Sequence, residues 1–138
     1  MLEGTGSSTF GAMRAPRGFT LIELLIVIVI IGILATMAIL NYTSSKQKTY
    51  EASMKADLRN LATAEEAYYY DSSSYTNSFP LMSNYTPSSG NAIVVNEATR
   101  VGWSATASST GTGRKCYLFF GSATPVGNAT KEGVAACS

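Results

Sequence analysis

A long apolar run that holds a single charged residue constrains this 138-residue chain more than any other feature. From Phe19 to Leu40 the sequence reads FTLIELLIVIVIIGILATMAIL, and Glu23 is the one charged residue in those 22 positions. A helix of this length spans about 33 Å, which is close to the thickness of the hydrocarbon core of a bilayer, about 30 Å. Because the run is apolar on every side, it must be buried in lipid or among other helices.

Three interpretations of the run are open. A cleaved secretory signal has an apolar region of about 7–15 residues and a small-residue cleavage site, and neither fits well here. A plain single-pass anchor explains the length but not Glu23, because an unpaired carboxylate in hydrocarbon costs several kcal/mol. The third interpretation is an assembly helix, which first sits in the membrane and then packs against copies of itself.

The stretch RGFTLIELLIVIVIIGILA resembles the leader junction and N-terminal helix of type IV pilins and the related pseudopilins. Basic residues before Gly18, an aromatic residue at Phe19 and an acid at Glu23 carry the resemblance. It implies a leader peptide over residues 1–18, a prepilin peptidase that cuts after Gly18, and N-methylation of the new terminus at Phe19. Met13 is an alternative start that would give a shorter leader.

The resemblance also gives Glu23 a role in assembly. Cleavage creates a positive amine at Phe19, four residues or about 6 Å of helix from Glu23. The resemblance implies that Glu23 of an incoming subunit pairs with the Phe19 amine of a neighbour, which neutralises both charges and fixes the axial register. A chance glutamate, or one that merely caps the helix at the interface, is the alternative.

The partners that the resemblance implies are other copies of this chain in a helical homopolymer, a prepilin peptidase, and a pilus assembly platform driven by a cytoplasmic ATPase. The subunit is expected in the inner membrane before assembly and in an extracellular pilus at the cell surface afterwards. DNA would be a further partner in a filament that serves DNA uptake. The two charges at Arg114 and Lys115 do not support that partner by themselves.

The helix is predicted to continue well beyond the apolar run. Neither Pro nor Gly occurs from 41 to 71, and apolar residues recur there at spacings of three and four. We expect one helix over about 20–70, of roughly 75 Å, whose part from 41 to 70 is amphipathic. Its apolar stripe comprises Tyr50, Met54, Leu58, Leu61 and Tyr68; the charged residues that lie mostly off this stripe are Lys46, Lys48, Glu51, Lys55, Asp57 and Arg59.

The remainder predicts a small sheet. Residues 71–90 are loop-like in composition, with a short helical turn around Leu81 and Met82. Strand signals follow in AIVVNE, in the alternation Val101, Trp103, Ala105 and Ala107, and in KCYLFFG, with a hairpin loop over 108–115. The expected fold class is α+β: a long N-terminal helix packed against three or four antiparallel strands. The predicted domains are a leader (1–18), a transmembrane and filament-core helix (19–40) and a globular head (41–138), whose sheet and tail occupy 91–138.

The two cysteines, Cys116 and Cys137, allow three interpretations. They form a disulfide, remain free thiols, or contribute to a metal site, although neither a His nor a third Cys supports a metal. The resemblance implies the disulfide, because type IV pilins have a C-terminal disulfide-bounded loop. Such a bridge would tie down the tail and stabilise the fold by roughly 3 kcal/mol.

An enzyme is not expected. The chain has no His, which is the commonest general base, and neither a phosphate-binding loop nor a catalytic cluster of carboxylates is visible. No cofactor or metal is implied. The leading interpretation is a structural subunit of a type IV pilus that serves motility, adhesion or DNA uptake. The alternatives are a pseudopilin of a type II secretion or competence system, and a membrane-tethered binding module.

Leu40 departs from the family pattern, since many type IV pilins carry a proline at this place. Proline inside a helix costs about 3 kcal/mol, whereas Gly32 weakens a helix by only about 1 kcal/mol relative to alanine. We therefore predict a continuous helix through 32–41 in the isolated subunit. In the filament, we predict less unravelling of this segment than in relatives that carry the proline.

Overall fold

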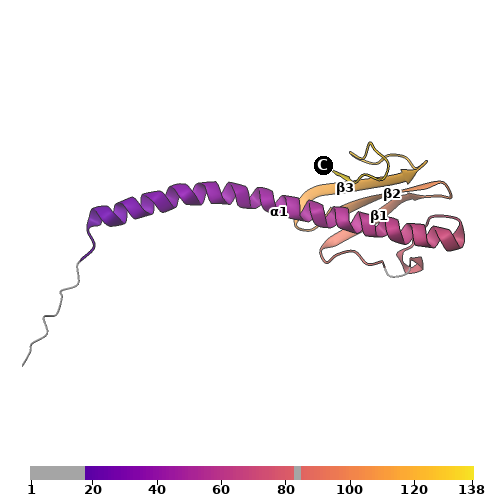
Figure 1. Ribbon diagram of the computed structural model, residues 1–138, viewed down its shortest axis with the longest axis horizontal. Coiled ribbons are helices and arrows are strands. Elements are labelled where there is room, and N and C mark those ends of the chain that lie inside the picture. Colours follow the sequence, from indigo (N-terminus) through magenta and orange to yellow (C-terminus); the bar gives the residue numbers. More distant parts are fainter. Residues whose placement is uncertain (1–17, 83–84) are drawn as a thin grey trace, which may run out of the picture. The chain divides into compact units, whose positions relative to one another are not determined.

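The computed structural model describes residues 18–82 and 85–138. The predicted leader, apart from Gly18, lies outside the described residues. The order of elements is α1 (Leu21–Ser72), the 3₁₀ turn η1 (Phe79–Leu81), β1 (Asn91–Ala98), β2 (Gly102–Ser109), β3 (Thr112–Gly121) and β4 (Ala136–Cys137) (Figure 1). One long helix with a small antiparallel sheet confirms the predicted α+β class.

The helix α1 is continuous from Leu21 to Ser72, which confirms the prediction of unbroken helix through 32–41 in the isolated chain. It ends where Ser73 adopts a left-handed backbone conformation, with φ of 55°. The chain divides into two compact units, and the boundary falls within α1 between Ala38 and Ile39. The second unit, Ile39–Ser138, is called the head below, and the two units are described separately.

The four strands form one antiparallel sheet in the order β1-β2-β3-β4. The hairpin between β2 and β3 is tighter than predicted, because the strands extend to Ser109 and from Thr112 and leave only two residues between them. Gly111 allows this turn to lie close against α1, since a Cβ there would collide with the ring of Tyr50. Sequence composition alone favoured a longer loop over 108–115 because Gly, Ser and Thr are common turn residues.

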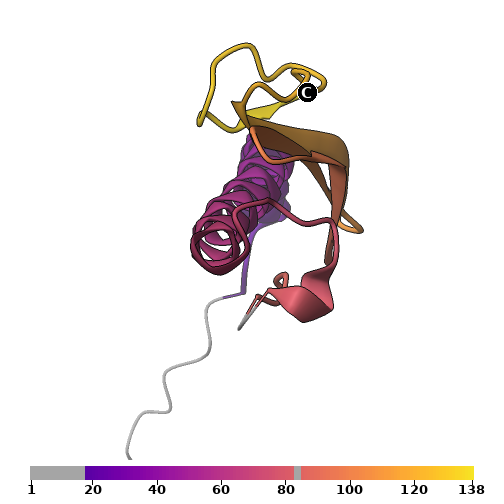
Figure 2. The same cartoon turned by 90° about the vertical axis from the view of Figure 1, so that its right-hand side faces the viewer.

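The core of the head lies between α1 and one face of the sheet, as Figure 2 shows along the helix. Met54, Leu58 and Leu61 of α1 are fully buried, which confirms the centre of the predicted apolar stripe. Their partners in the core include Ile93 of β1, Trp103, Ala105 and Ala107 of β2, and Leu118 of β3. The predicted ends of the stripe, Tyr50 and Tyr68, are only partly buried.

The C-terminal segment, residues 122–135, lies along the β3 edge of the sheet (Figure 2). Its Gly133 N–H donates to the carbonyl oxygen of Phe119 at 3.0 Å, and Ala123 and Ala129 within it are buried. Trp103 and Ser104, adjacent residues of β2 that face opposite sides of the sheet, are both buried. The alternation predicted from Val101 onward was wrong at its start, since Val101 precedes β2 and is exposed.

Candidate assembly site

The start of α1 is capped by reciprocal hydrogen bonds between Thr20 and Glu23. The Glu23 carboxylate accepts from the Thr20 backbone N–H at 2.9 Å and from the Thr20 hydroxyl at 2.7 Å. The Glu23 N–H donates to the Thr20 hydroxyl oxygen at 3.3 Å. This arrangement is a capping box, which satisfies amide groups that a helix start leaves without partners.

The capping box shows what Glu23 does within one chain. Its carboxylate lies beside the positive end of the helix dipole, and the side chain is exposed. Phe19, which would carry the amine after cleavage, is 82% exposed. The cap that the sequence offered as an alternative is therefore present. A bond between Glu23 and the Phe19 amine of another copy is a contact between chains and stays a prediction.

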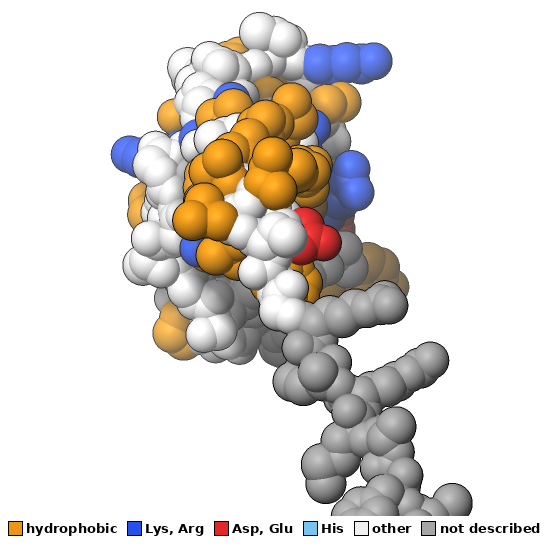
Figure 3. All heavy atoms as spheres, turned by 90° about the vertical axis from the view of Figure 1, so that its left-hand side faces the viewer, with side chains coloured by type: hydrophobic (Ala, Val, Ile, Leu, Met, Phe, Trp, Pro, Cys, Tyr) orange, Lys and Arg blue, Asp and Glu red, His pale blue; other side chains and the backbone are white. Residues whose placement is uncertain are grey.

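Apolar side chains gather on the first half of α1, as the space-filling view along the helix shows (Figure 3), and they are exposed. Their exposed fractions range from 46% at Val27 to 85% at Leu21. Soluble monomers rarely expose contiguous apolar surface of this extent. By length and composition, α1 contains a segment that could cross a membrane. This surface requires lipid or other helices around it.

Two carboxylates inside the head were not predicted. Asp57 was placed mostly off the apolar stripe, but it is only 2% exposed. It accepts from the Ser88 N–H at 3.1 Å, the Ser88 hydroxyl at 2.7 Å and the Asn91 side-chain amide at 2.7 Å. Asp57 therefore fastens α1 to the loop before β1. These donors lie more than 30 residues away in sequence, so local periodicity gave no sign of them.

Glu65 is fully buried and has fewer hydrogen-bond donors than Asp57. One of its oxygens accepts from the Thr76 N–H at 3.0 Å, and the other has no hydrogen-bond partner among the described residues. Burial raises the pKa of the Glu65 carboxyl to about 7, and the bond from Thr76 opposes that shift. The neighbouring charge of Glu66 raises this pKa further. Glu65 is thus the buried group whose charge changes near neutral pH.

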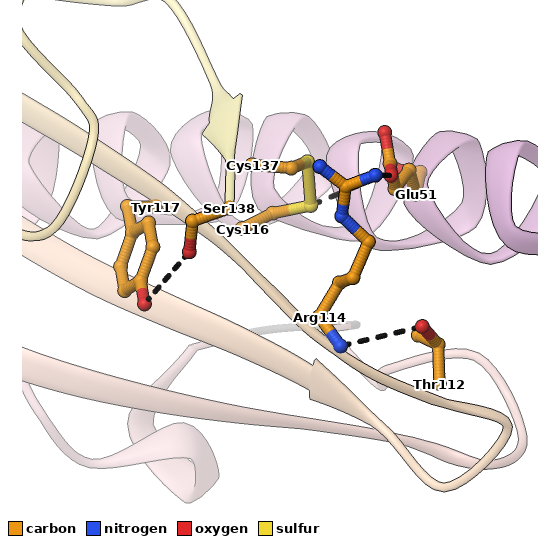
Figure 4. The surroundings of a disulfide bond; sticks show 7 residues. All are labelled: Glu51, Thr112, Arg114, Cys116, Tyr117, Cys137 and Ser138. Carbon is orange, nitrogen blue, oxygen red and sulfur yellow. Dashed lines mark hydrogen bonds and ion pairs between the residues drawn. A yellow bond between two sulfur atoms is a disulfide. The ribbon is translucent and has the colours of Figure 1, made fainter.

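The predicted disulfide is present between Cys116 of β3 and Cys137 of β4 (Figure 4). The Cys116 sulfur lies 3.9 Å from the backbone carbonyl oxygen of Glu51 on α1. Arg114, two residues before Cys116, forms an ion pair with the Glu51 carboxylate at 2.8 Å. The C-terminal strand, β3 and α1 are therefore joined at one place in the head.

Comparisons with known proteins agree with this arrangement. A family model described as "Prokaryotic N-terminal methylation motif" matches residues 13–39. The type IV major pilin protein PilA of Myxococcus xanthus is 39% identical over 75 residues, which are 54% of this chain and 34% of that protein. The type IV wide pilus major component PilA4 of Thermus thermophilus is 44% identical over 64 residues, 46% of this chain and 49% of the relative.

A relative from a secretion system shares the same region. The type II secretion system core protein G of Klebsiella pneumoniae is 40% identical over 63 residues, 46% of this chain and 45% of the relative. The chain thus spans between a third and a half of the length of these curated relatives. Together with the exposed apolar helix, the matches show that the chain carries the N-terminal methylation motif of prokaryotic type IV pilins and prepilins, at the start of a pilin-like α+β fold.

Proposed function

We propose that this chain is a structural subunit of a type IV pilus, which polymerises through the first half of α1. The observation that carries the proposal is the apolar surface of that half-helix, exposed on all sides and joined to a capped, acid-bearing start. Before assembly the lipid of the inner membrane would cover this surface, and in the filament the helices of other copies would replace the lipid. The named pilin relatives support this function.

The proposal includes processing by a prepilin peptidase after Gly18 and N-methylation of Phe19. Among the described residues, no atom lies within 4 Å of the place where a Cβ of Gly18 would be, and Phe19 is largely exposed. Both observations support this processing step. Export by an assembly platform and its ATPase completes the expected route to the cell surface.

The Glu23 carboxylate would bind the Phe19 amine of a neighbouring subunit in this filament. An amine and a carboxylate that are both removed from water stabilise assembly only if they are paired. The capping box complicates a simple test, because Glu23→Ala removes both the charge and the cap. Glu23→Gln is the matched variant, since a glutamine at this position of a capping box can still accept the Thr20 bonds.

The experiment compares Glu23→Ala and Glu23→Gln, each as the sole copy of the subunit. Both variants should enter the membrane and lose the leader, but both should yield few or no sheared surface filaments. Immunoblots of membranes and of sheared fractions measure these steps. Normal filament yield from Glu23→Gln would show that Glu23 acts as a cap and not as a charged assembly ligand.

Deleting the gene separates a filament subunit from a membrane-tethered binding module. The proposed function predicts that the surface filaments disappear and return when the wild-type gene is restored. Filaments of normal number and composition in the deletion strain would contradict it.

A further inference from the structure

The two ends of the head can be defined by contacts along α1. At the proximal end, the turn between β2 and β3 lies against Tyr50, and Arg114 pairs with Glu51. At the distal end, Tyr75 donates through its hydroxyl to Glu66 and through its N–H to the carbonyl of Thr99, in the turn between β1 and β2. These contacts assign each charged residue of the head to one end or to the part between them.

The proximal end is cationic. Its basic residues are Lys46, Lys48, Lys55, Arg114 and Lys115, and its one acid on the surface, Glu51, is already paired with Arg114. That pair is the one salt bridge within residues 18–82 and 85–138. Lys48 and Lys115 are exposed, and neither has an acidic partner in the described chain. Figure 3 faces this end and shows basic side chains at several places around the head.

The distal end is anionic. Its exposed or partly exposed acids are Glu66, Asp71, Glu97 and Glu132, which outnumber the nearby bases Arg100 and Lys131. Glu132 accepts from the Gly121 N–H at 2.6 Å, and Glu97 accepts from the Thr124 N–H at 3.0 Å. Each bond occupies one carboxylate oxygen and fixes the side chain. The second oxygen of each stays available to an external cation.

The charge difference also follows one stripe of α1. Lys48, Lys55, Arg59 and Glu66 are separated in turn by seven, four and seven residues, each close to a whole number of helical turns, so they lie along one face with the three bases before the acid. Lys55 and Glu66 are about 16 Å apart along the axis, and Lys48 and Glu66 about 27 Å. Two parallel copies shifted along the helix axis by such distances would place a lysine of one beside the glutamate of the other.

We propose that the cationic proximal end of each head docks on the anionic distal end of a neighbouring copy in the filament. This inference rests on the proposed function, since it requires parallel copies of the chain. Contacts between different surfaces of identical subunits are the kind that build open helical filaments. Complementary charge favours the correct neighbour and register, because a wrong register brings like charges together.

The test reverses the charges on full-length chains expressed as the sole subunit. The proximal reversal is Lys48→Glu with Lys115→Glu, and the distal reversal is Glu66→Lys with Asp71→Lys. Each should lower the yield of sheared filaments by about tenfold or more, since it places like charges in contact. The chain with all four substitutions restores opposite charges and should return the yield to within about threefold of wild type.

Lys131→Glu is the control, because it makes the same lysine-to-glutamate substitution, at one position, at the end that is already anionic. It should assemble at the wild-type yield. A non-reducing gel of the membrane fraction checks that each variant accumulates with its disulfide formed. As a second measurement, high salt should fragment wild-type filaments more readily than low salt, since salt screens exposed charge pairs.

Three results would overturn the proposal. The first is a wild-type yield of sheared filaments from both reversals. The second is a chain with all four substitutions that accumulates normally in the membrane but does not recover the yield of filaments. The third is loss of assembly from the proximal reversal alone with an unaffected distal reversal, which would indicate that the lysines meet an anionic lipid surface instead. Absence of the chain from wild-type filaments is a separate result, and it would refute the proposed function itself.

Discussion

Two buried carboxylates on α1, those of Asp57 and Glu65, differ in the number of hydrogen bonds that they accept. Asp57 receives three hydrogen bonds from Ser88 and Asn91, which compensate a negative charge away from water. Glu65 receives one, from Thr76, and its second oxygen has no hydrogen-bond partner among the described residues. A buried carboxylate with so little compensation favours its protonated form. Asp57 therefore serves as an anchor, whereas Glu65 makes the head sensitive to pH.

The stability of the head should fall as pH rises from about 5 to 8. The pKa of Glu65 is about 7 in the fold, against 4.5 for an ordinary glutamate, so the folded state holds its proton more tightly. Its stabilising contribution is complete below pH 4.5 and is lost as pH rises through 7. The loss is on the order of 3–4 kcal/mol at most, since one pKa unit corresponds to about 1.4 kcal/mol.

Denaturant unfolding of the chain in detergent at several pH values measures this effect. The fluorescence of Trp103, the chain's one tryptophan and a buried core residue, reports on the head. Glu65→Gln keeps an oxygen that can accept from Thr76 and should flatten the dependence between pH 5 and 8. An equal pH slope in wild type and variant would contradict this account of Glu65.

The sequence predicted the residues whose role follows from local spacing and missed those whose partners are distant. Met54, Leu58 and Leu61 repeat at helical intervals, so their burial was predictable. Asp57 and Glu65 lie among them, but their hydrogen-bond donors come from the loop after α1. Periodicity cannot reveal such nonlocal donors. The cap at Thr20 and Glu23 is local, and the sequence indicated it only as an alternative to pairing between subunits.

The helix α1 is continuous from Leu21 to Ser72. Gly32 is the one glycine of the helix, and Leu40 stands where many type IV pilins carry a proline. A leucine keeps its amide hydrogen bond and is a good helix former, so the backbone stays helical through this region. The elements of the head were also largely predictable, except that composition overestimated the length of the loop between β2 and β3.

We predict that α1 unravels less between Gly32 and Leu40 inside the filament than the same segment does in relatives that carry the proline. A helical reconstruction of the wild-type filament measures this directly. Leu40→Pro is the informative variant, because proline destabilises a helix interior by about 3 kcal/mol and should introduce a local break. Extended backbone across these residues in the wild-type filament would show that packing forces, and not proline, cause the unravelling.

The stability of the head as a whole depends on how its C-terminal segment is held. Residues 122–135 lie along the β3 edge of the sheet, and the bridge between Cys116 and Cys137 closes the loop that contains them. The segment has little regular secondary structure of its own, so local hydrogen bonds alone hold it weakly. The disulfide limits how far the two ends of this loop can separate in the unfolded chain.

Replacing both cysteines, Cys116→Ala with Cys137→Ala, should lower the free energy of unfolding by roughly 3 kcal/mol. Denaturant unfolding followed through Trp103 measures the change. Wild-type protein unfolded under reducing conditions is the matched comparison, because it loses the bridge without losing either side chain. Equal stability of the oxidised wild type and the double variant would contradict a stabilising role for the bridge.

We propose that this chain builds a surface filament after its leader is removed. Peptide mass spectrometry of filaments sheared from cells that express the wild-type chain tests this proposal. This chain should be the main component and should begin with N-methylated Phe19. Filaments that lack the chain, or that contain it with residues 1–18 still attached, would refute the proposal.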